Sequence, residues 1–160
     1  MPTTGVKLSR QQTGRIGEAM ATAMFLRWGF RVYSPEADDH GVDLVVRHPQ
    51  SESYYEIQVK TVTGRKYAFI PKSRVPELSG DRIVCYIRLG LEGESDIYLI
   101  PMRAWRHPNA VLVDRAYDKP GQTSKPEYGI CSSKKSDPLL EPYRADLVLS
   151  KIVEQASHKP

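Results

Sequence analysis

Long hydrophobic runs and paired cysteines are both missing from this chain of 160 residues. No apolar run approaches ~20 residues, so we expect no membrane-spanning helix. The first four residues begin no hydrophobic segment of the secretory type. The two cysteines, Cys85 and Cys131, form no C-x-x-C pair. We therefore expect reduced thiols in a cytoplasmic protein, with Cys85 buried in an apolar strand.

Several compact catalytic motifs are absent as well. The chain has no G-x-x-x-x-G-K-[ST] loop, no G-x-S-x-G turn, no H-E-x-x-H pair and no cysteine–histidine spacing typical of a metal site. Gly14 and Gly17 lie at a helix start, where they could bind phosphate or permit close helix packing. The chemistry therefore has to come from residues that are spread along the chain.

The composition is that of one ordinary globular domain with a basic balance. Hydrophobic residues make up 40% and charged residues 26%, and the net charge of +4 favours an anionic partner. We expect a single domain over 1–160, with a core over about 9–115. The segment 116–141 is rich in Lys, Ser, Pro and Gly without periodicity, which predicts a flexible loop. A C-terminal helix is expected over 142–155.

Helices and strands are mixed along the chain, which predicts the α/β class. Ser9 or Thr13 can cap a helix that ends near Gly29, and its apolar stripe is expected at Ile16, Ala19, Met20, Ala23 and Leu26. Strands are expected at 30–33, 42–47, 54–61, 67–70, 82–89 and 96–101, with an edge strand at 110–113.

The stretch 41–61 organises the rest. It reads as two strands around a polar turn, and Asp43 opens an otherwise apolar run. A carboxylate there costs a few kcal/mol unless it is solvated, paired or bound to a metal. In the second strand, the period of two places Glu56, Gln58 and Lys60 on one face.

Basic residues flank this stretch on both sides. They are Lys7, Arg10 and Arg15 before it, and Arg65, Lys66, Lys72 and Arg74 after it. Neither flank contains an acidic residue between these positions. They form either a solvated basic face or a rim that binds the phosphates of a nucleic acid.

Glu18, Asp43 and Gln58 would supply hard oxygen ligands if they converged, and such ligands suit Mg²⁺ or Mn²⁺. The Val59 carbonyl could add a ligand, and Lys60 could orient a water or stabilise charge on a phosphate. Simpler interpretations remain open. Glu18 could be a solvated acid of the first helical turns, Asp43 and Lys60 a structural ion pair, and His40 a solvated loop residue rather than a ligand or base.

These positions resemble the PD-(D/E)XK nuclease superfamily. Asp43, about fifteen residues, then Gln58-Val59-Lys60, with Glu18 on the preceding helix, is similar to archaeal-type Holliday junction resolvases and to homing endonucleases with a Gln-x-Lys variant. The resemblance covers roughly residues 9–101. It implies a restriction-endonuclease-like core with a mixed sheet flanked by helices, Mg²⁺-dependent DNA cleavage, and a homodimer or homotetramer.

The same resemblance implies roles for individual residues. Asp43 and Gln58 would be metal ligands, Lys60 the catalytic lysine and Glu18 the acid on the helix. Gln58 stands where the superfamily usually has a second acid, and Glu56 lies on the same face, where it could compensate. We therefore expect either a DNA endonuclease or a nuclease-fold protein that binds nucleic acid without cleaving it. A subunit that only binds other proteins is the third hypothesis.

Overall fold

The computed structural model describes residues 6–37, 40–90 and 94–156. Two α-helices, α1 and α2, span Arg10–Arg27 and Ala145–Ala156. The strands are β1 (Arg31–Tyr33), β2 (Leu44–Arg47), β3 (Tyr54–Thr63), β4 (Ala68–Pro71), β5 (Arg82–Leu89), β6 (Ser95–Pro101), β7 (Leu112–Arg115) and β8 (Glu127–Ile130). Short 3-10 turns are η1 (Lys72–Arg74), η2 (Met102–Arg106), η3 (Asp137–Leu139) and η4 (Glu141–Tyr143).

A mixed five-stranded sheet forms the centre, in the order β1-β2-β3-β5-β6. Only β3 and β5 run parallel, with Gln58 opposite Val84 and Lys60 opposite Tyr86, and the other neighbours are antiparallel. The predicted α/β class with a mixed central sheet is confirmed. β3 pairs with β2 on one edge and β5 on the other, and α1 packs against it.

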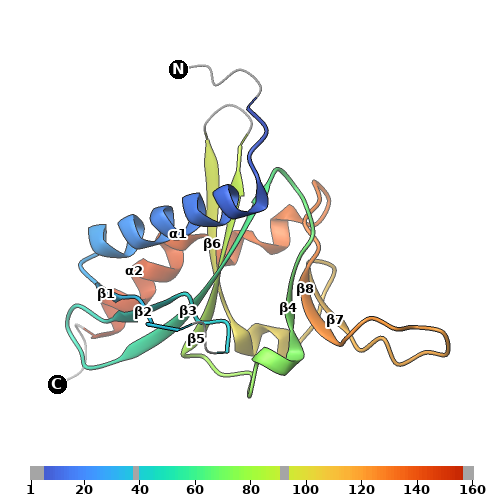
Figure 1. Ribbon diagram of the computed structural model, residues 1–160. Helices are drawn as coiled ribbons and strands as arrows, with labels where there is room; N and C mark the ends of the chain where they lie inside the picture. The colour runs from blue at the N-terminus through green and yellow to red at the C-terminus, as the bar shows by residue number, and fades with distance from the viewer. Residues whose placement is uncertain (1–5, 38–39, 91–93, 157–160) are drawn as a thin grey trace.

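The molecule has three layers, which Figure 1 shows around the central sheet. Alternation along β3 and β5 sends Ile57 and Cys85 to the face that α1 and α2 cover. Val84 and Tyr86 point to the opposite face, where a second sheet in the order β4-β8-β7 packs together with η2. The predicted strand at 67–70 is therefore present, but it belongs to this second sheet.

Helix α1 begins at a capping box. The Ser9 hydroxyl accepts from the Gln12 N–H, and the Gln12 side chain accepts from the Ser9 N–H. Its buried side is Gly17, Ala21 and Phe25.

The apolar stripe expected on α1 is wrong except at Met20, which packs against the core. Ile16 and Leu26 are 37% and 56% exposed. The face with the small residues is buried instead, because they let the helix approach β3 closely. A Cβ at Gly17 would lie 1.7 Å from Thr61 Oγ1.

The expectation of a structureless segment over 116–141 is wrong for residues 127–130. These form β8, the central strand of the second sheet, and η3 follows them. β8 is only four residues long and is held between β7, the preceding strand, and β4, which lies much earlier in the chain, so its own sequence carries little strand signal. The C-terminal helix begins at Ala145, slightly later than expected, because η4 takes up Pro142.

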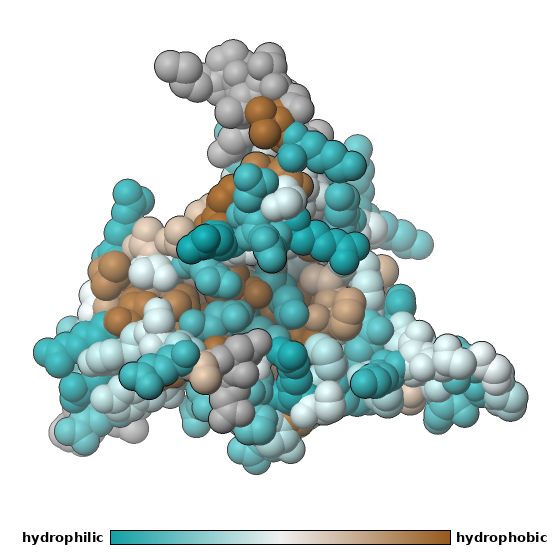
Figure 2. All heavy atoms as spheres, viewed as in Figure 1, coloured by the Kyte–Doolittle hydropathy of each residue, from teal (hydrophilic) through white to brown (hydrophobic). Residues whose placement is uncertain are grey.

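Hydrophilic residues cover most of the face drawn in Figure 2, and hydrophobic side chains gather beneath the C-terminal end of α1. No helix among the described residues is long and apolar enough to cross a membrane. Cys85 is fully buried, and burial raises the pKa of its thiol to about 12. Both cysteines are free thiols, as the sequence predicts.

Candidate active site

Asp43 is fixed at the point where β2 and β3 separate. Its N–H donates to the Ile57 carbonyl (2.9 Å), and its Oδ2 accepts from the Val59 N–H (2.6 Å). The chain enters this position through a left-handed turn, with φ of 57° at His40 and 72° at Gly41. Gly41 suits that conformation because it has no Cβ. The carboxylate is thereby held across Gln58, the residue between its two backbone partners.

Glu18 approaches Asp43 from the helical layer. Burial raises the pKa of the Glu18 carboxyl, the negative charge of Asp43 raises it further, and Arg15 opposes the shift. A cation bound near both carboxylates would relieve the repulsion that Asp43 exerts on Glu18. The close contact of Gly17 with Thr61 is what brings this turn of α1 down onto β3.

Gln58 lies on the other face of β3 and is only 4% exposed. Its Oε1 is buried and has no hydrogen-bond partner among the described residues. Gly41 leaves room for its amide, since a Cβ there would come within 2.9 Å of Gln58 Nε2. An unsatisfied buried oxygen costs about 1–3 kcal/mol, so its retention requires an explanation.

Lys60 is half-buried on the same face of β3, two residues beyond Gln58. The structure therefore places Gln58 and Lys60 on one face of the strand, as the period of two predicts. Glu18 belongs to α1, which packs on the opposite face, and the charge of Asp43 acts on it from the point where β2 and β3 separate.

Arg82 is a further charged residue of this site, and sequence reasoning missed it. It is 4% exposed at the start of β5, its guanidinium donates to the His40 carbonyl, and its Nε has no partner among the described residues. Burial lowers the pKa of Arg82, and the charges of Glu56 and Asp43 oppose that shift. Arg82 could have been found from the sequence, because it is a charged residue at the start of an apolar strand, as Asp43 is.

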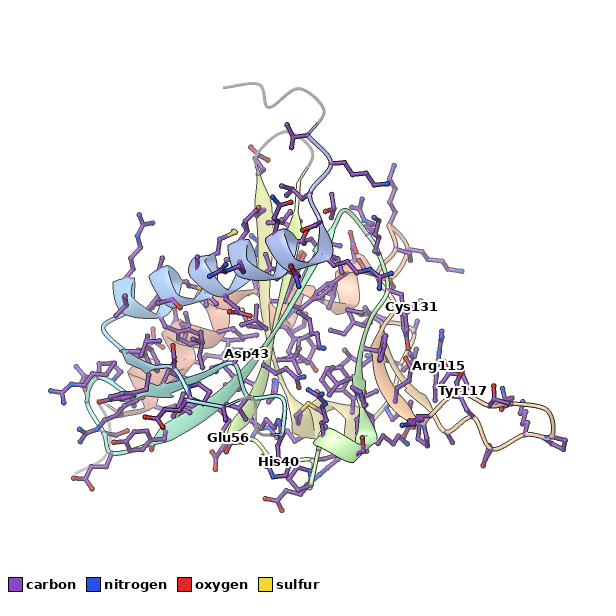
Figure 3. All side chains as sticks on the ribbon, in the orientation of Figure 1. His40, Asp43, Glu56, Arg115, Tyr117 and Cys131 are labelled. Atoms are coloured by element: carbon purple, nitrogen blue, oxygen red, sulfur yellow. The ribbon has the colours of Figure 1, made fainter. Side chains whose placement is uncertain are left out.

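Glu56 and His40 lie at the margin of the site. Glu56 is exposed and stands opposite Arg82 in the β3–β5 register. The His40 side chain is exposed, and its backbone carbonyl serves as the acceptor for Arg82. Figure 3 shows Asp43 beneath α1, with Glu56 and His40 further from the helix.

The chemistry of these side chains suits a small hard cation. Carboxylates such as Asp43 and Glu18 and an unbonded amide oxygen such as Gln58 Oε1 are the kind of ligand that Mg²⁺ or Mn²⁺ prefers, and these ions keep several waters and need few protein ligands. Across the described ranges, no three His, Cys, Asp or Glu side chains gather into a potential metal cluster. The candidate metal ligands are therefore Asp43, Glu18 and the amide of Gln58.

The basic residues predicted to contact nucleic acid divide into two groups. Arg65 forms an ion pair with Asp137 (2.8 Å), and Lys72 forms one with Asp114. The remaining side chains are exposed: Lys7, Arg10, Arg15, Lys66 and Arg74. Arg74 also lies beside Gly41, since a Cβ on that glycine would be 3.4 Å from Arg74 Cδ.

Comparison with known proteins adds evidence on the fold. No family model and no curated protein sequence matches the chain. The Holliday junction resolvase Hjc of the archaeal hyperthermophile Archaeoglobus fulgidus is similar in structure, with a TM-score of 0.54, 13% identity, and coverage of 86% of this chain and 95% of the resolvase.

The bacterial homing endonuclease I-Ssp6803I is similar to the same degree. Its TM-score is 0.54 and its identity 18%, and the match covers 96% of this chain and 100% of the endonuclease. Together with the mixed sheet and its flanking helices, these matches show that the chain has the restriction-endonuclease-like nuclease fold.

Proposed function

We propose that this chain is a metal-dependent endonuclease that hydrolyses phosphodiester bonds in DNA. The observation that carries the proposal is the unpartnered, buried Oε1 of Gln58, the residue before the Val59 N–H that holds the Asp43 carboxylate. A structural ion pair would leave no reason for an unsatisfied amide oxygen at this position. The nuclease fold is the second support, because the proteins of similar structure are a resolvase and a homing endonuclease.

Asp43 and Gln58 would hold a Mg²⁺ or Mn²⁺ ion, with the Val59 carbonyl as a further ligand and Glu18 and Glu56 as additional candidates. When bound, the ion supplies positive charge that polarises a phosphate oxygen. Asp43 is already oriented by the Val59 N–H, so binding would cost little rearrangement of that carboxylate.

Lys60 would act on the scissile phosphate itself. Its ammonium group either orients the attacking water or stabilises the negative charge that develops on the phosphate. Arg82 would act through the backbone, because its hydrogen bond to the His40 carbonyl fixes the turn that leads into Asp43. The exposed basic residues around the α1 start and η1 would bind DNA phosphates on either side of the cut.

The test is cleavage of supercoiled plasmid and of a four-way junction in Mg²⁺, Mn²⁺ or EDTA. We expect metal-dependent cutting by the wild type and none by Lys60→Ala. Lys134→Ala, which removes an exposed lysine in the turn after β8, is the matched control and should cut normally. Cutting in EDTA, or equal cutting by Lys60→Ala, would contradict the proposed site.

Metal binding can be measured separately from activity. A cation that binds only the folded state raises Tm with its concentration. We expect Mg²⁺ to raise the Tm of the wild type and to have a much smaller effect on Asp43→Asn. The substitution keeps the side-chain oxygen that accepts from Val59 but removes the charge.

A second candidate function is nucleic-acid binding without cleavage. It is favoured by one observation, namely that no third acidic, histidine or cysteine side chain joins the pair in the described part of the chain. Salt-dependent DNA binding, together with no cutting in either metal and no Mg²⁺ effect on Tm, would identify this function instead.

A further inference from the structure

The outer face of the second sheet carries a set of aromatic and basic side chains away from Asp43. Phe69 of β4, Gly129 of β8 and Val113 of β7 stand opposite one another in register, so they share one face of that sheet. The opposite face, with Ile70 and Ile130, packs into the core. Figure 3 shows Arg115 and Tyr117 together beside this sheet, apart from Asp43.

Tyr67 is held against this face by two specific contacts. A Cβ at Gly129 would come within 2.1 Å of the Tyr67 hydroxyl, so only glycine there admits the ring. The hydroxyl donates to Glu127 Oε2 (2.6 Å), and that carboxylate is only 8% exposed. Burial raises the pKa of Tyr67, and the bond to Glu127 raises it further, so the phenol stays protonated.

Phe69 and Arg115 extend this arrangement on either side of Tyr67. The Phe69 ring lies 6.3 Å from Tyr67, centroid to centroid, at an interplanar angle of 20°, and it is 48% exposed. The Arg115 guanidinium carbon lies 4.5 Å from the centre of the Tyr67 ring. We call Tyr67, Phe69 and Arg115 the aromatic platform. The half-exposed ring of Phe69, held beside Tyr67, is suited to binding a planar ligand.

The charges around the aromatic platform favour an anionic ligand. Lys66 precedes Tyr67 and is exposed, and the loop between β7 and β8 adds Lys119 and Lys125 against Asp118. Glu127 is already bonded to Tyr67, and Asp114 points to the other face, where it pairs with Lys72. A planar ring with an attached negative charge is what an unpaired nucleotide offers.

We propose that the aromatic platform binds unpaired bases of DNA by stacking on Phe69, with Arg115 and Lys66 contacting the adjoining phosphates. Bases inside a duplex have both faces covered, so this surface selects single-stranded DNA over continuous duplex. The inference rests on the proposed function only in taking DNA as the ligand, and it narrows the class of DNA that is bound.

The test is binding of a fluorescein-labelled oligo(dT) of about 20 nucleotides, followed by anisotropy in EDTA so that no cleavage occurs. Phe69→Ala should weaken binding about 5- to 100-fold while weakening duplex binding less than about 2-fold. Phe69→Trp should restore it. An oligonucleotide with one 2-aminopurine should lose fluorescence on binding the wild type but not Phe69→Ala, because stacking quenches that base.

Tyr54→Ala is the matched control. Tyr54 is 50% exposed on β3, and Arg47 lies 5.8 Å from the centre of its ring, so it offers the same chemistry elsewhere. It should change oligo(dT) binding less than about 2-fold, well below the loss of a stacked base. Equal losses in Tyr54→Ala and Phe69→Ala, or no loss in Phe69→Ala, would overturn the platform.

The platform and the nuclease proposal can fail separately. If the protein cleaves DNA with metal but Phe69→Ala does not change oligo(dT) binding, only the platform proposal is wrong. If oligo(dT) binding depends on Phe69 but the protein does not cleave DNA, only the endonuclease proposal is wrong. If Phe69→Ala instead dissociates an oligomer in light scattering and leaves DNA binding unchanged, the face belongs to a second copy of the chain and the platform is wrong.

Discussion

Strand β5 carries two buried arginines on the same face, in opposite situations. Arg88 Nη1 donates to Ser132 Oγ and Asp137 Oδ1, both at 2.7 Å. Its Nη2 donates to the Tyr98 hydroxyl (2.7 Å) and to Asp96 Oδ2 (3.1 Å). Arg82 donates to one backbone carbonyl, and its Nε has no partner among the described residues.

The difference is visible in their electrostatics. Burial lowers the pKa of Arg82, and its acidic neighbours do not fully compensate. Burial also lowers the pKa of Arg88, but the hydrogen bond to Asp137 and the nearby acids raise it overall. A saturated network is what a structural role requires, and here it joins the turn after β8 to the central sheet. The unsatisfied polar atoms of Arg82 and Gln58 have no such structural explanation, and the proposed metal and DNA site would supply one.

The largest expected effect is on cleavage by Asp43→Asn. Removing the ligand charge should lower the cleavage rate at least ~100-fold, while the Val59 N–H keeps an acceptor and the fold is retained. Asp137→Asn is the counterpart in the saturated network, and it should cleave normally but unfold at lower urea. Gel assays and urea titration separate the two. An Asp43→Asn enzyme that cuts within about threefold of wild type would break the comparison.

Arg88→Met should be the more destabilising of the two arginine substitutions. Breaking a buried pair by removing one partner costs about 3–5 kcal/mol, since Asp137 and Asp96 lose their common partner. Arg82→Met should cost less than half as much, because fewer bonds are lost, yet it should reduce cleavage more strongly. Urea midpoints measure the first effect and plasmid cleavage the second. Equal losses of unfolding free energy would mean that Arg82 is structural too.

Gly17→Ala tests the close contact that positions Glu18. A methyl group there meets Thr61, and overpacking of this kind costs about 1–3 kcal/mol. Gly14→Ala is the control in the same helix: nothing lies within 4 Å of its Cβ position, so it should stabilise by about 0.5–1 kcal/mol. Thermal unfolding gives both values. A stabilised Gly17→Ala would show that α1 does not approach β3 as described.

The smallest effect is a difference in pH dependence. The pKa of Glu18 is raised above its ordinary 4.5, so ionising it opposes folding, and its penalty appears as pH rises through and above that value. Burial raises the pKa of Asp137, but hydrogen bonds from Arg65 and Arg88 lower it overall, below its ordinary 3.8. Its contribution to stability is therefore present above 3.8 and is lost as pH falls below it.

Glu18→Gln should accordingly raise the urea midpoint at neutral pH and leave it unchanged in acid. Asp137→Asn should lower the midpoint at neutral pH, with a loss that shrinks in acid. Titrations between about pH 3 and pH 7 measure both slopes. A Glu18→Gln protein less stable than wild type at neutral pH would contradict the repulsion between Glu18 and Asp43.

The local elements could be predicted because their signals are local. Ser9 and Gln12 form the capping box of α1, and the alternation in β3 places Gln58 and Ile57 on opposite faces of the sheet. The buried face of α1 was mispredicted, because side-chain size at Gly17 and Ala21 matters more for close packing than apolar character at Ile16. β8 was missed because it is short and one of its two partners, β4, lies far from it in the sequence.

The sequence by itself determined the α/β class, the order of most strands, and the candidate positions Glu18, Asp43, Gln58 and Lys60. Only the tertiary structure decided that the charge of Asp43 acts on both Glu18 and Arg82, and that Arg115 meets Tyr67. The physical reason is one of range. Periodicity and capping act over a few residues, whereas a shared electrostatic field or a stacked ring depends on segments that only the completed fold brings together.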